Sequence, residues 1–136
     1  VPIDQEAKAL YHCAAVMASN HMIALADAAA EMLSSCGFDQ ESAVKALAPL
    51  MRGNISAIIA SGPAAALTGP IERNDLNTVA EHLHALERAD PQTAELYCFL
   101  SSRLVKIACD KHPNRDYTEL KELLTDERKS LKGERQ

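Results

Sequence analysis

The chain has 136 residues, 47% of them hydrophobic but only 4% aromatic, and a formal net charge of -5 at pH 7. Because it is acidic and has no cluster of lysine and arginine, neither nucleic acid nor a membrane surface is an expected partner. Cys13, Cys36, Cys98 and Cys109 stand singly among apolar neighbours without C-x-x-C spacing, which predicts reduced, buried thiols in a cytoplasmic protein.

The first predicted element is a long helix. Asp4 is a good N-cap, neither Pro nor Gly follows until Gly37, and the many alanines favour helix. Polar residues interrupt the apolar stretch 13–33, so we do not expect it to span a membrane. The helix is apolar around most of its circumference, which predicts either the central pillar of a bundle or part of an interface.

A second helix is expected to start after a cap at Asp39 and to kink at Pro49. Two Gly-Pro pairs, at 62–63 and 69–70, then break regular structure, and at most one turn of helix fits between them. Three more helices are predicted. The first runs from a cap at Asn74 or Asp75 to about Ala89, the second opens at Asp90-Pro91 with Pro at the first helical position and runs to about Lys111, and the third starts after a cap at Asp116.

These elements predict an all-α fold, a bundle of five or six helices around the long N-terminal one. No strand pattern and no repeat is evident. We assign residues 1–125 to one helical domain. Residues 126–136 alternate in charge and contain one large apolar residue, Leu131, so we expect this tail to fray.

A polar stripe is predicted on the first helix. At about 100° per residue, Ser19 lies about 20° and Asn20 about 80° from His12. One interpretation is a face that touches water. The other is a partly buried cleft, which Val16 and Ile23 within the stripe favour. In that cleft His12 is the candidate catalytic residue, since imidazole exchanges protons, and Ser19 and Asn20 would orient a substrate.

The second candidate feature is the loop that contains Thr68 and Gly69. Its Gly-Pro pairs are equally consistent with simple helix termination. Alternatively, a hydroxyl and a backbone N–H beside a residue without Cβ can approach a substrate closely. Adjacent helical residues diverge by about 100°, so Cys13 is assigned to the core rather than paired with His12. No set of Cys, His and Asp has zinc-ligand spacing, so no metal site is predicted.

Four stretches carry a family resemblance: YHCAAVMASNHMIAL, GFDQESAVKALAPLMRG, SGPAAALTGPIERNDLNTVAEHLHAL and LYCFLSSRLVKIA. Over about residues 8–125 the chain resembles a helical domain of unknown function. In bacterial proteins that domain follows a Rossmann-like NAD(P)-binding domain, and those proteins resemble pyrroline-5-carboxylate reductase and ketopantoate reductase. The most specific motif is GPAAALTGPIERND.

The resemblance implies a fold like the C-terminal domain of the 6-phosphogluconate dehydrogenase superfamily. There a long helix and its neighbours form a homodimer interface and close the substrate side of the nicotinamide cleft. By position, His12, Ser19 and Asn20 fall on that helix, and Thr68 and Gly69 fall on a loop facing the cleft. Many superfamily members carry Lys followed by Asn on the helix, so their proton-transfer chemistry does not transfer directly to this chain.

The chain has no G-x-G-x-x-G after a strand and therefore no usual means of holding a dinucleotide. No cofactor is expected on this chain. The resemblance implies NAD(P) on a separate N-terminal domain, and the isolated chain is predicted to be inactive. Two hypotheses follow: a substrate-binding and dimerisation domain of an oxidoreductase acting on a small carbonyl or imine compound, or a non-catalytic helical interaction module.

Overall fold

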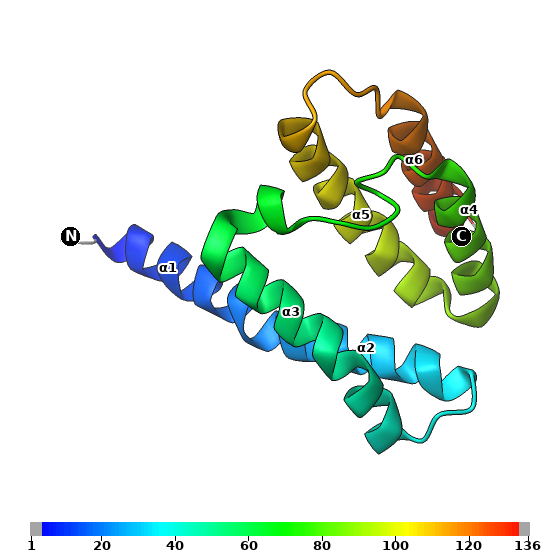
Figure 1. The fold of residues 1–136 in the computed structure, drawn as a ribbon, viewed down its shortest axis with the longest axis horizontal. Coiled ribbons are helices and arrows are strands. Elements are labelled where there is room, and N and C mark those ends of the chain that lie inside the picture. Colours follow the sequence, from blue (N-terminus) through cyan, green and yellow to red (C-terminus); the bar gives the residue numbers. More distant parts are fainter. Residues whose placement is uncertain (1–3, 134–136) are drawn as a thin grey trace. The chain divides into compact units, whose positions relative to one another are not determined.

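The structure is a computed structural model that describes residues 4–133, and these are all-helical, without a strand. This confirms the predicted fold class. The chain divides into two compact units, one up to Gly53 and the other from Asn54. Figure 1 shows the helices in chain order, and each unit is described by itself.

The first unit begins with α1 (Gln5–Ala18) and α2 (Asn20–Ser35), where one uninterrupted helix was predicted. The predicted ends are correct: Asp4 accepts a hydrogen bond of 2.8 Å from the Ala7 N–H, and Gly37 follows α2 with a φ of 99°. The interruption is at Ser19, with φ -123° and ψ -69°. Its hydroxyl donates to the Ala15 carbonyl at 2.6 Å, a back-bond that bends helices.

The helices of the first unit bury very few side chains. In α1 no residue is buried, in α2 only Ala30, and in the adjoining part of α3 only Ala43. Large apolar side chains are left in contact with solvent instead; they include Leu10, Tyr11, Met17, Met22, Ile23 and Leu25. By length and composition alone, Gln5–Ser35 also qualifies as a helix that could cross a bilayer, with a mean hydropathy of 1.2. Core helices and leader sequences pass the same test.

The third helix, α3 (Gln40–Ala66), begins after Asp39, whose carboxylate accepts from the Ser42 N–H at 3.0 Å. Its dihedrals depart from helix at Gly62 (φ 80°, ψ 168°) and not at Pro49, where a kink was expected. Glycine adopts this positive φ without a Cβ clash. One turn follows from Pro63, and its carbonyl accepts from the Leu67 N–H at 3.0 Å, as the two Gly-Pro pairs predicted.

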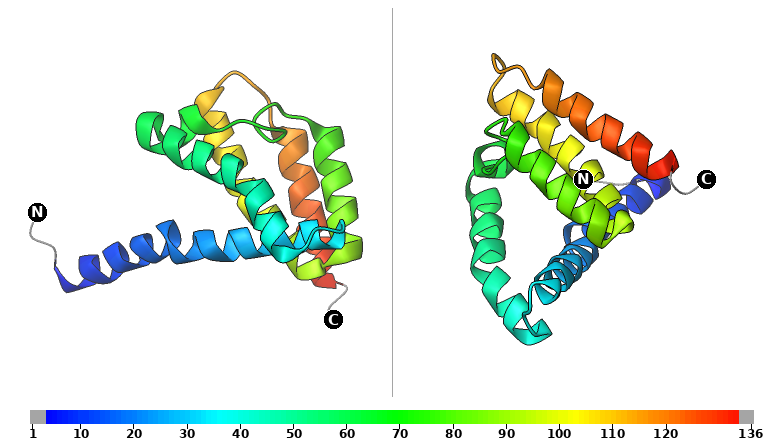
Figure 2. Two further views of the ribbon diagram at one scale, coloured as in Figure 1. Left: turned by 60° about the horizontal axis from the view of Figure 1, so that its bottom comes forward. Right: turned by 90° about the vertical axis from the view of Figure 1, so that its right-hand side faces the viewer.

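The second unit contains the hydrophobic core, built by α4 (Leu76–Ala89), α5 (Pro91–Lys111) and α6 (Thr118–Gly133). These three helices lie side by side in Figures 1 and 2. Two caps are confirmed: Asp75 accepts from the Thr78 N–H and Asp90 from the Gln92 N–H. Asp116 lies one residue before the cap position of α6, and its carboxylate accepts from the Thr118 N–H. The core comprises Ile71, Val79, Leu83, Cys98, Val105, Ala108, Tyr117, Leu120 and Leu124.

The end of α6 corrects the expected frayed tail. The helix runs to Gly133, and Leu131 is 1% exposed. Leu131 lies two helical turns after Leu124 and therefore on the same face. It packs with Leu86 and Ala94 in a second small cluster. The helix thus continues where an apolar residue finds a surface to pack on. Residues 134–136 lie outside the described part.

Candidate functional site

The loop predicted to bind substrate borders a pocket of about 310 Å³ in the second unit. Thr68 lines the pocket, together with Asn54 from α3. The other lining residues are apolar and come from α3, the loop and α5: Ile58, Pro63, Ala66, Leu67, Leu104 and Ile107. None of the lining residues is charged, so the pocket favours a neutral, mainly apolar group, with one amide and one hydroxyl available for hydrogen bonds.

The backbone of this loop turns sharply after Thr68. Gly69 has a φ of 98°, in the region that favours glycine, and its carbonyl accepts from the Arg73 N–H at 3.1 Å. The Pro70 carbonyl accepts from the Asp75 N–H at 2.9 Å, which closes the turn at the start of α4. Ile71, which follows Pro70 in this loop, is 4% exposed, and its side chain belongs to the hydrophobic core. The loop is therefore fixed by its own hydrogen bonds and by a buried side chain.

A polar cluster around Glu72 ties the same loop to the segment between α5 and α6. The Glu72 carboxylate oxygen Oε1 lies 2.5 Å from His112 Nε2, 3.9 Å from Lys111 Nζ and 4.0 Å from Arg115 Nη1. The hydrogen bond from His112 is the main reason that the pKa of Glu72 lies below its ordinary value, and the charges of Lys111, His112 and Arg115 act in the same direction. The folded state thus favours the ionised carboxylate.

Backbone carbonyls of the loop are held by the same partners. Lys111 Nζ donates to the Leu67 carbonyl at 2.8 Å, beside Thr68. The Tyr117 hydroxyl and the Arg115 guanidinium donate to the Glu72 carbonyl at 2.6 and 2.8 Å. We call Glu72, Lys111, His112, Arg115 and Tyr117 the loop clasp. It sets the position of the backbone that carries Thr68.

The three predicted residues of the first unit are all exposed. His12 lies on α1, Ser19 at the junction, and Asn20 at the start of α2. The Ser19 hydroxyl lies 3.2 Å from Asn20 Oδ1, so these two are adjacent in space as well as in sequence. Thr68 and Gly69 belong to the other unit. The structure therefore brings together Ser19 with Asn20, and Thr68 with Gly69, and the assembly of all five into one site stays a prediction.

The prediction of buried thiols is wrong for two cysteines. Cys13 and Cys36, both in the first unit, are exposed. Cys98 is buried, and this burial raises the pKa of its thiol to about 11. Cys109 is half-buried, and all four thiols are free.

The sequence interpretation missed the residues that shape and hold the loop. Asn54 lies two residues after Arg52 and two before Ser56, so no signal in the sequence singled it out. Glu72 lies within the most specific motif, but its partner His112 is 40 residues away in sequence. Only the fold brings such a pair together, so neither spacing nor composition could reveal the clasp.

The described residues thus form an all-α chain whose second unit has a loop-bordered, uncharged pocket. Residues 1–104, more than half of the chain, match the family described as Domain of unknown function (DUF2520), and the chain belongs to this family. The match includes all five predicted site residues and ends within α5, so α6 lies outside it. Among curated proteins and solved structures, none matches this chain.

Proposed function

We propose that this chain is the substrate-binding and dimerisation domain of an NAD(P)-dependent oxidoreductase-like protein. The cofactor would be held by a separate Rossmann-like domain, and hydride would pass between it and a small carbonyl or imine compound. The observation that carries the proposal is the pocket of about 310 Å³ beside Thr68, on the loop for which the sequence predicts substrate contact. A pocket at the lower end of the usual range of about 300–1,000 Å³ suits a small molecule.

In this proposal the roles of the residues are divided by chemistry. His12 is the proton donor to the carbonyl or imine, because imidazole exchanges protons near neutral pH. Ser19 and Asn20 orient the substrate, and Thr68 and Gly69 supply a hydroxyl and a backbone contact. The Ser19 hydroxyl already donates to the Ala15 carbonyl, so its oxygen is available as an acceptor.

The exposed apolar faces of α1 and α2 support the dimerisation part of the proposal. A second copy of the chain would cover them in a symmetric interface, in which one surface meets itself. Insertion into a bilayer is disfavoured because His12, Ser19, Asn20 and Asp27 would enter hydrocarbon, where unpaired polar groups are costly.

The catalytic role is tested on a protein that joins this chain to its upstream coding sequence, which the proposal expects to contain G-x-G-x-x-G between a strand and a helix. His12→Ala should abolish turnover of a carbonyl or imine substrate and leave NAD(P) binding unchanged, measured by cofactor fluorescence. His21→Ala, also exposed in the first unit, is the matched control. Unchanged turnover in His12→Ala would remove His12 from the mechanism.

The second candidate function is a non-catalytic helical interaction module. The lack of buried side chains in α1 favours it, because such a surface suits any apolar partner. The upstream sequence separates the two functions: a dinucleotide-binding fingerprint supports the oxidoreductase, and its absence supports the interaction module.

A further inference from the structure

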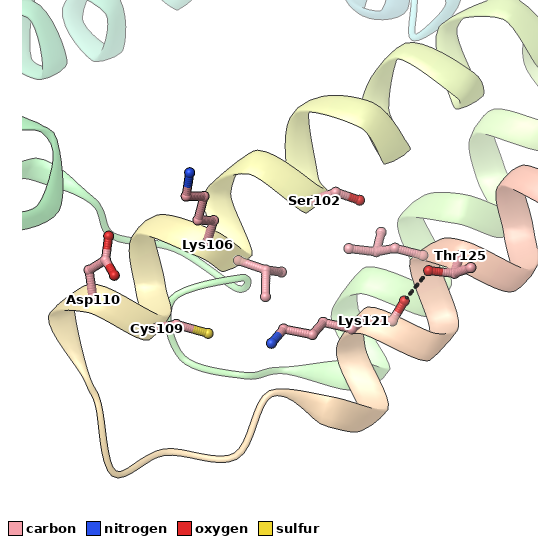
Figure 3. A pocket seen from close by; sticks show the side chains of 8 residues that line it. Ser102, Lys106, Cys109, Asp110, Lys121 and Thr125 are labelled. Atoms are coloured by element: carbon pink, nitrogen blue, oxygen red, sulfur yellow. Dashed lines mark hydrogen bonds between the residues drawn. The ribbon is translucent and has the colours of Figure 1, made fainter.

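A second hollow lies on the other side of α5, between α5 and α6, and has no part in the proposed function. It is a groove of about 390 Å³ within the second unit, shown in Figure 3. Val105 and Leu124 form its floor and are 1% and 0% exposed. Apart from Ser102, every residue that lines it lies beyond the residues matched to the family. The groove is therefore a property of this chain that the family match does not explain.

The groove exists because small side chains face each other where the two helices pack. Ser102 and Cys109 come from α5 and Thr125 from α6, where larger residues would fill the space. The two hydroxyls are already used as donors: Ser102 donates to the Cys98 carbonyl and Thr125 to the Lys121 carbonyl, each at 2.8 Å. They can therefore accept hydrogen bonds from a ligand, but they do not supply donors for one.

The available donors in the groove are two lysines, Lys106 on α5 and Lys121 on α6. Within residues 4–133 neither ammonium forms an ion pair or a hydrogen bond. One acidic residue, Asp110, also lines the groove. Asp116 lies near Lys121: hydrogen bonds from Thr118 are the main reason that the pKa of Asp116 is lowered, and the charge of Lys121 acts in the same direction. The lining thus has an excess of positive charge in a chain whose net charge is -5.

We infer that this groove binds a small organic carboxylate. Its anionic group would lie at the Lys121 ammonium, and a short aliphatic part would lie on Val105 and Leu124. Lys106, whose ammonium points away from Lys121 in Figure 3, would add its positive charge from the rim of the groove. The combination of an apolar floor with two ammonium groups, neither of which forms an ion pair within residues 4–133, selects an amphipathic anion over a neutral molecule of the same shape. In Figure 3 the side chains of Lys121 and Cys109 extend toward the same end of the groove. A bound ligand would therefore shield the Cys109 thiol.

The test uses the full chain and two probes of equal length, hexanoate and 1-hexanol, at low salt because screening weakens exposed charge pairs. Amide chemical shifts should move saturably with hexanoate around Val105 and Leu124, with weaker binding of 1-hexanol. Lys106→Gln or Lys121→Gln should each weaken hexanoate binding by about two- to fivefold, the range for an exposed charge pair. Ser102→Leu should abolish binding of both probes by filling the groove, and leucine suits a helix.

Thiol protection provides an independent readout. With the exposed Cys13 and Cys36 replaced by serine, hexanoate should slow alkylation of Cys109 by neutral iodoacetamide. Lys129→Gln, on α6 but outside the groove, is the matched control and should leave hexanoate binding unchanged. Equal binding of the two probes, an equal loss in Lys129→Gln, or shifts centred on the exposed faces of α1 and α2 would overturn the inference. Each of these outcomes leaves the proposed oxidoreductase function untouched.

Discussion

The two units differ most in what their helices cover. In the second unit, α4, α5 and α6 surround a core whose largest members, among them Tyr117, Leu120 and Leu124, are almost completely buried. In the first unit, α1 buries nothing, and Leu10 and Ile23 are 73% and 69% exposed. Both units are rich in apolar residues. Hydrophobic content alone therefore does not produce a core, and the first unit has the exposed apolar surface that the proposed dimer would bury.

A pair of leucines gives the largest predicted contrast. Leu124→Ala should lower the free energy of unfolding by about 2–5 kcal/mol, because it removes buried methyl groups and leaves a cavity. Leu10→Ala should change the unfolding free energy of the monomer by about 0.5 kcal/mol or less, since its side chain is exposed. Urea denaturation followed by circular dichroism measures both. Equal losses would refute the assignment of the core to the second unit.

A charge placed on the exposed apolar face of α2 tests the proposed dimer. Ile23→Glu should weaken dimerisation by about 1–3 kcal/mol per copy, because a polar group would be buried without a partner. In a symmetric interface the substituted residue occurs in both copies, so the total loss is twice this value. Size-exclusion chromatography with light scattering would report the loss. Gln92→Glu, exposed at the start of α5, adds the same charge in the second unit and should leave the dimer intact. Loss of the dimer in both variants would point to net charge as the cause.

The loop clasp is predicted to make a smaller, pH-dependent contribution. The pKa of Glu72 is lowered from its ordinary value of 4.5, so its ionised form stabilises the folded chain above that pH and the contribution is lost as the pH falls through the lowered pKa. Glu72→Gln should therefore be less stable than the native chain at about pH 7 and should approach it at about pH 3. Thermal unfolding at both pH values measures this. Glu81→Gln on α4 should show no such convergence.

The junction at Ser19 should give the smallest effect. Ser19→Ala removes the back-bond to the Ala15 carbonyl and substitutes a better helix former, so the helix signal should rise and stability should increase by about 0.5 kcal/mol or less. Ser34→Ala on α2 changes the same propensity without that bond. A larger gain of helix in Ser19→Ala than in Ser34→Ala is the expected result. Equal gains would mean that the back-bond does not bend the helix.

Local signals in the sequence predicted the helix ends well. Asp4, Asp75, Asp90 and Asp116 all accept the expected backbone hydrogen bonds, because a cap depends only on residues within one turn. The break at Ser19 was missed since serine at that position has no strong bias against helix. The continuation of α6 was missed because burial of Leu131 depends on distant Leu86.

The candidate site was predictable only in its local parts. Thr68 and Gly69 stand out through the two Gly-Pro pairs, and the structure places a pocket beside Thr68. The contact between Glu72 and His112 joins two loops that are distant in sequence, so no local pattern encodes it. Exposure of Cys13 was missed for a related reason, since an apolar neighbourhood in sequence does not reveal whether a covering surface exists.

Amide hydrogen exchange as a function of protein concentration tests most directly the claim that the first unit is covered by a second copy while the second unit has its own core. We predict that protection of amides in α1 and α2 increases with protein concentration, because dimerisation stabilises only what it buries. Protection in α4, α5 and α6 should already be high at the lowest concentration and should change far less. Protection of α1 and α2 that is independent of concentration would contradict the account.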